Sequence, residues 1–125
     1  MRDAASSPCR VVLCDDAVGY VRIVKLLIQS ADLAVVGEAV NGEEAVAVCR
    51  ELQPDILLLD ISMPIMDGLT ALPLVLDASP DTKVIMHSGF GTDAVRERAR
   101  ELGAVDFIEK GIEPLALPDR ILAHR

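Results

Sequence analysis

The sequence predicts an α/β fold in which one parallel sheet of five strands is covered by helices on both faces. The chain has 125 residues, a length that fits one domain with a single core. Short apolar runs alternate along it with segments of helical periodicity, and several runs are apolar at every position, as central parallel strands are. Strict alternation of strand and helix implies a parallel sheet with right-handed crossovers.

Five short apolar runs are predicted as strands. Hydrophobic residues make up 51% of the chain and aromatic residues only 2%, so the core between strands and helices must be aliphatic. The runs are RVVLC (10–14), LAVVGEA (33–39), ILLLD (56–60), KVIMH (83–87) and VDFIE (105–109).

Segments of helical periodicity separate these strands. In the first, Val21, Val24 and Ile28 share one face, as on a helix that packs against a sheet. Thr92 and Gly103 suit the N-cap and C-cap of the fourth, whose charged run RERARE (96–101) we interpret as a solvated face. The predicted helices are 18–30, the segment from Asn41-Gly42 to just before Pro54, 68–76 (interrupted by Pro73), 92–102 and 114–124.

Charge and hydropathy exclude several classes of protein. The net charge of -8 argues against direct binding of nucleic acid, because phosphate contacts depend on Lys and Arg. No apolar run reaches the roughly 18 residues of a membrane span, and the start, MRDAASSPCR, lacks the apolar segment of a secretory signal. We therefore expect a cytoplasmic protein that does not bind membranes, with a flexible N-terminal arm over 1–9 and one domain over 10–125.

The cysteines fit no metal or redox motif. Cys9, Cys14 and Cys49 show neither CxxC spacing nor the density of a disulfide scaffold. We expect reduced, mostly buried thiols.

Chemistry-bearing side chains stand at the ends of the predicted strands. Ligands of such a sheet bind beyond the carboxyl ends of the strands, near the point where the strand order reverses. Asp15 and Asp16 end the first strand and Asp60 ends the third. Ser88 follows the fourth strand and Lys110 follows the fifth. All five side chains are therefore expected at one edge of the sheet.

This combination predicts phosphate chemistry at a Mg²⁺ site. Three carboxylates at one edge would repel one another unless a cation joined them. Mg²⁺ prefers oxygen ligands and is commonly held by one or two carboxylates together with a substrate phosphate. The Ser88 hydroxyl and the Lys110 ammonium suit phosphoryl oxygens, and an aspartate can accept a phosphoryl group covalently. Taken singly, each residue has an ordinary role as helix cap, turn hydroxyl or surface charge.

In this order, these motifs resemble the receiver domain of two-component response regulators. The resemblance runs from Arg10 to about Leu122 and implies a flavodoxin-like, doubly wound sheet in the order 2-1-3-4-5 with five flanking helices. The motifs that carry it are the Asp15-Asp16 pair, VVGEAVNGEEAV (35–46), PDILLLDISMPIMDG (54–68), Ser88-Gly89 and GAVDFIEK (103–110).

The resemblance implies a role for each residue around the acceptor. Asp60 would take a phosphoryl group from a phosphohistidine, while Ser88 and Lys110 would bind the phosphoryl oxygens. The acyl phosphate would then hydrolyse slowly in the same site. The domain would thus be a signalling receiver rather than an enzyme, although it would catalyse its own phosphorylation and dephosphorylation. Met63-Pro64 and Asp67-Gly68 would shape the loop after the acceptor.

The resemblance also implies a metal set and a switch. Mg²⁺ would be bound directly by Asp16, mainly through water by Asp15, and by Asp60 and the carbonyl of Ser62. Phe107 occupies the position of an aromatic residue that changes rotamer when the loop after Ser88 moves inward. The surface that responds would be formed by the fourth helix, the fifth strand and the fifth helix.

Four positions depart from the family pattern or vary within it. Gly111 follows Lys110 where the family usually has a proline, often with a cis peptide bond, and glycine does not favour that form. Phe107 lacks the hydroxyl of the commoner tyrosine. Phe90, like Ser62, occupies a variable position that influences dephosphorylation. For His87 we favour a structural imidazole, and for Tyr20 a packing role.

The implied partners are a sensor histidine kinase or phosphotransfer protein, and a downstream effector domain or protein. A homodimer is also compatible with the resemblance.

Two other function classes stay open. A metal-dependent aspartyl phosphatase would use similar chemistry, but it commonly places an acid two residues after its nucleophile, where this chain has Ser62. A module of the same fold that is never phosphorylated would be expected to lack the acids or the lysine. The proline-bearing last helix favours a domain cut from a longer regulator.

Overall fold

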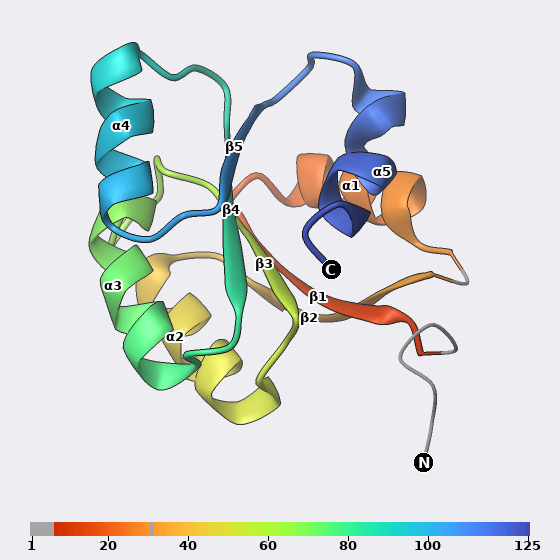
Figure 1. Cartoon of the computed structure of the whole chain (residues 1–125), viewed down its shortest axis with the longest axis horizontal. Coiled ribbons are helices and arrows are strands. Elements are labelled where there is room, and N and C mark those ends of the chain that lie inside the picture. Colours follow the sequence, from red (N-terminus) through yellow and green to blue (C-terminus); the bar gives the residue numbers. More distant parts are fainter. Residues whose placement is uncertain (1–6, 31) are drawn as a thin grey trace.

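A single parallel sheet organises the chain, which the computed structural model describes over residues 7–30 and 32–125. The strands pair in the order β2-β1-β3-β4-β5 (Figure 1). Both the predicted α/β class and the strand order that the resemblance implies are therefore confirmed. The strands are β1 (Cys9–Cys14), β2 (Leu33–Ala39), β3 (Ile56–Leu59), β4 (Lys83–Ser88) and β5 (Asp106–Glu109).

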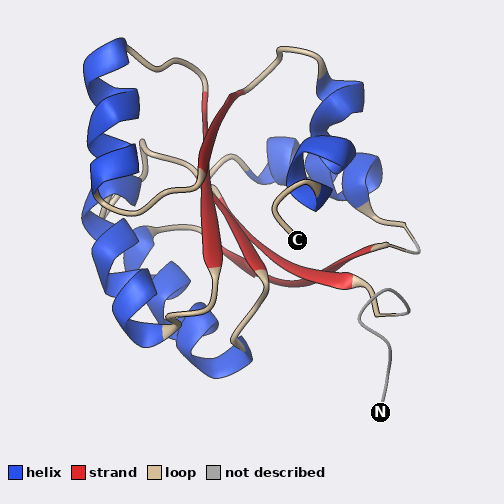
Figure 2. Cartoon of the chain, in the orientation of Figure 1, coloured by secondary structure: helices blue, strands red, loops and turns tan. Residues whose placement is uncertain are grey.

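Helices cover both faces of this sheet. Figure 2 shows α1 and α5 on one side and α2, α3 and α4 on the other. Within the described ranges, no helix combines the length and apolar character needed to cross a membrane. The helices are α1 (Val18–Ile28), α2 (Gly42–Leu52), α3 (Gly68–Ala78), α4 (Asp93–Glu101) and α5 (Leu117–Leu122), with a short 3-10 helix, η2 (Pro114–Ala116), before α5.

Most predicted bounds agree with the structure to within two residues, and two helices need correction. Helix α3 continues through Pro73 to Ala78. Proline removes one backbone donor, but Leu72 and Val75 are fully buried, and this packing maintains the helix. The last predicted helix, 114–124, is divided into η2 and α5. The predicted arm lies mostly outside the described residues, and Cys9 is already part of β1.

The sheet is buried on both faces because successive strand side chains point to opposite sides. Val11 and Ile56 pack toward α1 and α5, whereas their neighbours Val12 and Leu57 pack toward α2, α3 and α4. The fully buried side chains are chiefly Ile, Leu and Val, as the scarcity of aromatic residues predicted. All three cysteines are free thiols in these cores.

The predicted N-cap of α4 is confirmed, whereas the C-cap is Leu102 and the predicted Gly103 comes one residue later. The Thr92 hydroxyl accepts a hydrogen bond from the Val95 N–H at 3.2 Å. Gly103 follows the helix with a φ of +112°, a left-handed conformation that glycine adopts without steric cost. The Ala104 N–H then reaches back to the Ala99 carbonyl at 3.0 Å, which is the bond of a Schellman ending.

Gly68 holds the start of α3 against the loop that follows β3. A Cβ added at Gly68 would lie 2.0 Å from the carbonyl oxygen of Asp60, which is a main-chain atom. The Gly68 N–H donates to the Ile61 carbonyl at 2.8 Å. Asp67 caps the helix by accepting from the Thr70 N–H at 2.8 Å. The main chain at Asp60 is therefore fixed by the helix that comes after it.

Gly68→Ala should lower the free energy of unfolding by about 2 kcal/mol or more, because the added methyl group would overlap main-chain atoms. Gly19→Ala is the matched control, since nothing lies within 4 Å of its added Cβ. Alanine is the better helix former, so that control should be neutral or stabilising by up to about 1 kcal/mol. Urea denaturation measures both variants, and equal effects would contradict the close approach at Gly68.

Candidate functional site

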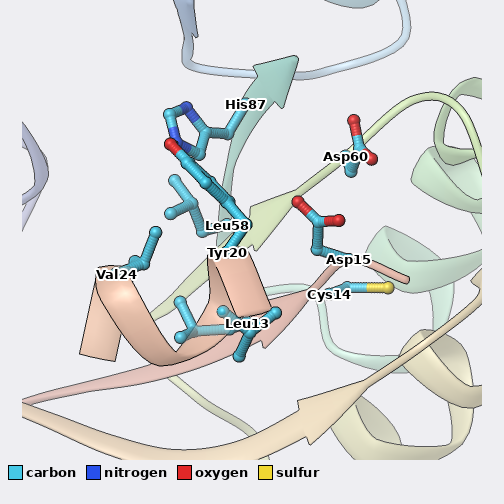
Figure 3. A pocket seen from close by; sticks show the side chains of 9 residues that line it. Leu13, Cys14, Asp15, Tyr20, Val24, Leu58, Asp60 and His87 are labelled. Carbon is cyan, nitrogen blue, oxygen red and sulfur yellow. The ribbon is translucent and has the colours of Figure 1, made fainter. Parts of the chain in front are cut away.

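Main-chain hydrogen bonds place Asp15 and Asp60 side by side at the carboxyl ends of β1 and β3. The Asp60 N–H donates to the Cys14 carbonyl at 2.9 Å, and the Asp15 N–H donates to the Ala39 carbonyl at 3.0 Å. Figure 3 shows the two carboxylates next to each other. Their residues are only 7% and 6% exposed, so both acids lie in a largely water-excluded setting.

The Lys110 ammonium joins these two carboxylates. Its Nζ lies 2.5 Å from Asp15 Oδ2 and 3.4 Å from Asp60 Oδ2. The Lys110 N–H also donates to the Ser88 carbonyl at 2.8 Å, which aligns the end of β5 with the end of β4. The predicted convergence of acids and lysine is therefore present. Gly111 has a φ of +80°, and no peptide bond in the described residues is cis.

The charges in this cluster perturb one another. Burial raises the pKa of Asp60, as does the neighbouring Asp15 charge, while Lys110 and the Ile61 N–H act in the opposite direction. The Ile61 N–H donates to Asp60 Oδ1 at 2.8 Å. Burial alone would lower the pKa of Lys110, but its bonds to the two carboxylates outweigh burial and raise it. The cluster therefore holds more negative charge than one ammonium balances.

The donor set fits a hard divalent cation. Asp15, Asp16 and Asp60 each offer a carboxylate oxygen, and these oxygens lie within 4.8 Å of one another. Asp16 is exposed, whereas the other two are buried. Neither acid of the pair caps α1, whose N-cap is Ala17 without a side-chain cap bond. Three carboxylates and one ammonium leave net negative charge at oxygen donors, which is the environment that Mg²⁺ prefers.

The two predicted serines both come after the acids along the chain. Ser88 ends β4, is 4% exposed and is paired through its carbonyl with Lys110. Ser62 lies two residues after Asp60, in the loop before α3, where it borders a groove together with Met63. The structure brings Ser88 to the same sheet edge as the acids. The Ser62 carbonyl as a metal ligand stays a prediction.

His87 and Tyr20 form a hydrogen-bonded pair that sequence reasoning treated as background. His87 Nδ1 lies 2.8 Å from the Ile108 carbonyl, and its Nε2 lies 2.7 Å from the Tyr20 hydroxyl. These bonds agree with a structural imidazole. Tyr20 does more than pack, because the Lys110 ammonium lies 4.7 Å from the centre of its ring. A polar His inside an apolar strand was the signal that a partner such as Tyr20 was needed.

The charged run of α4 is mostly exposed, as predicted, but Arg96 is only partly exposed and makes specific contacts that the sequence did not indicate. Its guanidinium lies 4.4 Å from the centre of the Phe107 ring, donates to the Gly91 carbonyl at 3.3 Å and pairs with Glu109 at 2.9 Å. Phe107 also fills the space beside Gly91, where an added Cβ would lie 2.6 Å from the ring. The predicted switch residue is therefore in contact with both the loop after β4 and helix α4.

Comparison with known proteins agrees with this architecture. The sequence model of the response regulator receiver domain matches residues 11–122. The chemotaxis protein CheY of Thermotoga maritima is 41% identical over 105 residues, covering 84% of this chain and 88% of that protein. A protein-glutamate methylesterase/protein-glutamine glutaminase of Methanosarcina acetivorans is 39% identical over 102 residues, which span 80% of this chain but only 29% of that protein.

Solved structures are similar over nearly the whole chain. The receiver domain of NarL from Mycobacterium tuberculosis superposes with a TM-score of 0.88 at 30% identity, covering 94% of this chain and 95% of that one. The complex of CheX with CheY, BeF3 and Mg²⁺ from Borrelia burgdorferi superposes with a TM-score of 0.86 at 30% identity, covering 93% of this chain and 88% of that one. With the family match extending from β1 to α5, the chain belongs to the response regulator receiver domain family of two-component signalling.

Proposed function

We propose that this domain is a cytoplasmic switch that accepts a phosphoryl group on Asp60 from a phosphohistidine of a sensor histidine kinase or phosphotransfer protein. The observation that carries the proposal is the buried pair Asp15 and Asp60 sharing the ammonium of Lys110. Buried carboxylates are costly to keep ionised, and replacing such ion networks with apolar residues is often neutral or stabilising. Their presence at the sheet edge is better explained by chemistry than by stability.

Asp60 is the nucleophile in this proposal. One carboxylate oxygen forms a bond to phosphorus while the bond from phosphorus to the donor histidine nitrogen breaks, and its electron pair returns to the imidazole. The Ile61 N–H on Oδ1 orients the carboxylate, and Oδ2 is the oxygen directed at Lys110. Lys110 neutralises one phosphoryl oxygen, and the Ser88 hydroxyl donates a hydrogen bond to another.

The acids around Asp60 are proposed to hold Mg²⁺. Asp16 would bind it directly and Asp15 mainly through water, with Asp60 and the Ser62 carbonyl as further ligands. The bound ion would neutralise charge on the phosphoryl oxygens. Support comes from the spacing of the three carboxylates and from the similar CheY whose complex contains BeF3 and Mg²⁺.

The proposed output surface lies on α4, β5 and α5. A phosphoryl group held by Ser88 would bias the following loop, which contacts Phe107 through Gly91. Arg96 extends that contact to Glu109 on β5, and with Arg120 of α5 these residues line one surface pocket. An effector domain, a separate effector protein or a second copy of the chain would bind this surface.

Intact-mass spectrometry after incubation with acetyl phosphate and Mg²⁺ tests the acceptor. The wild-type protein should gain the mass of one phosphoryl group, and Asp60→Asn or chelation of Mg²⁺ should abolish the gain. Asp67→Asn is the matched control, because asparagine is an equally good helix cap and the acid lies in the same loop. It should label like wild type.

Other outcomes of this experiment separate the remaining classes. A full-yield adduct on Asp60→Asn would place the acceptor elsewhere. Rapid turnover of a generic phosphate monoester by the wild-type protein would indicate a phosphatase. No adduct under any condition would favour a binding module that is never phosphorylated.

Asp60→Asn should also raise the thermal unfolding midpoint by a few degrees at neutral pH without Mg²⁺. The folded protein raises the pKa of Asp60, so ionisation of this group opposes folding above that pKa. Between the unfolded and folded pKa values, lowering the pH should therefore stabilise wild type more than Asp60→Asn. Scanning calorimetry over pH measures both, with Asp67→Asn as control. An Asp60→Asn variant that is less stable than wild type at neutral pH would contradict the prediction that ionisation of Asp60 opposes folding.

A further inference from the structure

Tyr20 of helix α1 is fixed against strand β4, beside the acidic cluster (Figure 3). Its hydroxyl lies 2.7 Å from His87 Nε2, and Lys110 Nζ lies over its ring, 4.7 Å from the ring centre. Figure 3 shows the tyrosine and histidine side chains extending toward each other beside Asp15. One side chain therefore contacts both a buried imidazole and the proposed phosphate-binding ammonium.

The direction of each hydrogen bond follows from the acceptor at the far end. The Ile108 carbonyl can only accept, so His87 Nδ1 carries a proton and donates to it. Burial lowers the pKa of His87, which keeps the imidazole neutral and leaves a lone pair on Nε2. The Tyr20 O–H therefore donates to His87. The tyrosine ring is anchored at its Cα by α1 and at its hydroxyl by β4.

The Lys110 side chain needs a contact besides its ion pairs to fix its direction. Its side chain is a flexible four-carbon stem, and the next residue, Gly111, lies in a left-handed conformation with nothing within 4 Å of its added Cβ. The bonds from Lys110 to Asp15 and Asp60 involve the same oxygens that the proposed chemistry uses. The Tyr20 ring is a contact of Lys110 that does not involve those oxygens.

We infer that Tyr20, held by His87, is a positioning residue that keeps the Lys110 ammonium directed at Asp60 during phosphoryl transfer. The aromatic face attracts the ammonium electrostatically, and this attraction strengthens where water is excluded. The hydrogen bond to His87 prevents the ring from turning away. This inference rests on the proposed function of Asp60 as acceptor.

The rate of adduct formation with acetyl phosphate and Mg²⁺, followed by intact mass, tests the role of the ring. Tyr20→Leu should be slower by about tenfold, the size expected for loss of a partly desolvated cation–aromatic contact. Tyr20→Phe keeps the ring and should stay within about threefold of wild type. Leu27→Ala truncates a partly buried side chain of the same helix that packs against the core, so it is the stability control and should label at the wild-type rate.

A double-mutant cycle shows whether Tyr20 acts through Lys110. In a Lys110→Ala background, Tyr20→Leu should cause no further slowing, because the ring has lost the group that it positions. An NMR measurement on the wild-type protein is independent of any variant that folds poorly. The ring face should shift the Lys110 side-chain resonances upfield relative to those of Lys25 and Lys83.

The outcomes distinguish this inference from the proposed function. If wild type and Leu27→Ala label normally while Tyr20→Leu is equally fast, or is slowed equally with and without Lys110, the positioning role of Tyr20 is wrong and the acceptor assignment stands. Lys110 resonances without an upfield shift would overturn the ring contact. An absence of any wild-type adduct would overturn the proposed function and this inference with it.

Discussion

The arrangement of the site depends on two buried carboxylates that share one ammonium. Asp15 and Asp60 come from neighbouring strands, and Lys110 bridges them from the end of β5. Burial removes water from these charges, and Lys110 and the Ile61 N–H offset that loss only in part at Asp60, whose pKa is raised. The cluster remains more negative than its lysine can balance, so it is arranged to receive a cation and to share its ammonium with a phosphoryl oxygen.

The sheet makes this arrangement possible because both its faces are apolar, whereas the residues at the carboxyl ends of its strands are polar. Packing on two sides fixes the strands, and parallel pairing then brings the residue after each strand to the same edge. Gly68 adds a constraint from the helix side, since its lack of a side chain lets α3 begin against the carbonyl of Asp60. Main-chain contacts thus fix the backbone at the acceptor.

The pattern of residues along the chain was sufficient to predict those parts that depend on strand ends. Asp60 and Lys110 could be brought together because carboxyl ends of parallel strands share an edge. A helix over 68–76 was predicted, but the interruption expected at Pro73 does not occur, because burial against the sheet outweighs the local cost of proline. The contact between Tyr20 and His87 joins a helix to a strand that is distant in sequence, and only the packing of α1 on the sheet determines it.

The same packing has a spectroscopic consequence. The chain contains one tyrosine and no tryptophan, and that tyrosine is Tyr20. Its ring lies 4.7 Å from the ammonium of Lys110, so the dominant ultraviolet fluorophore of the unlabelled protein borders the acidic cluster. An ion or group that entered the cluster would alter the local field at this ring. We therefore expect the emission of the native chain to report occupancy, with no dye or engineered reporter required.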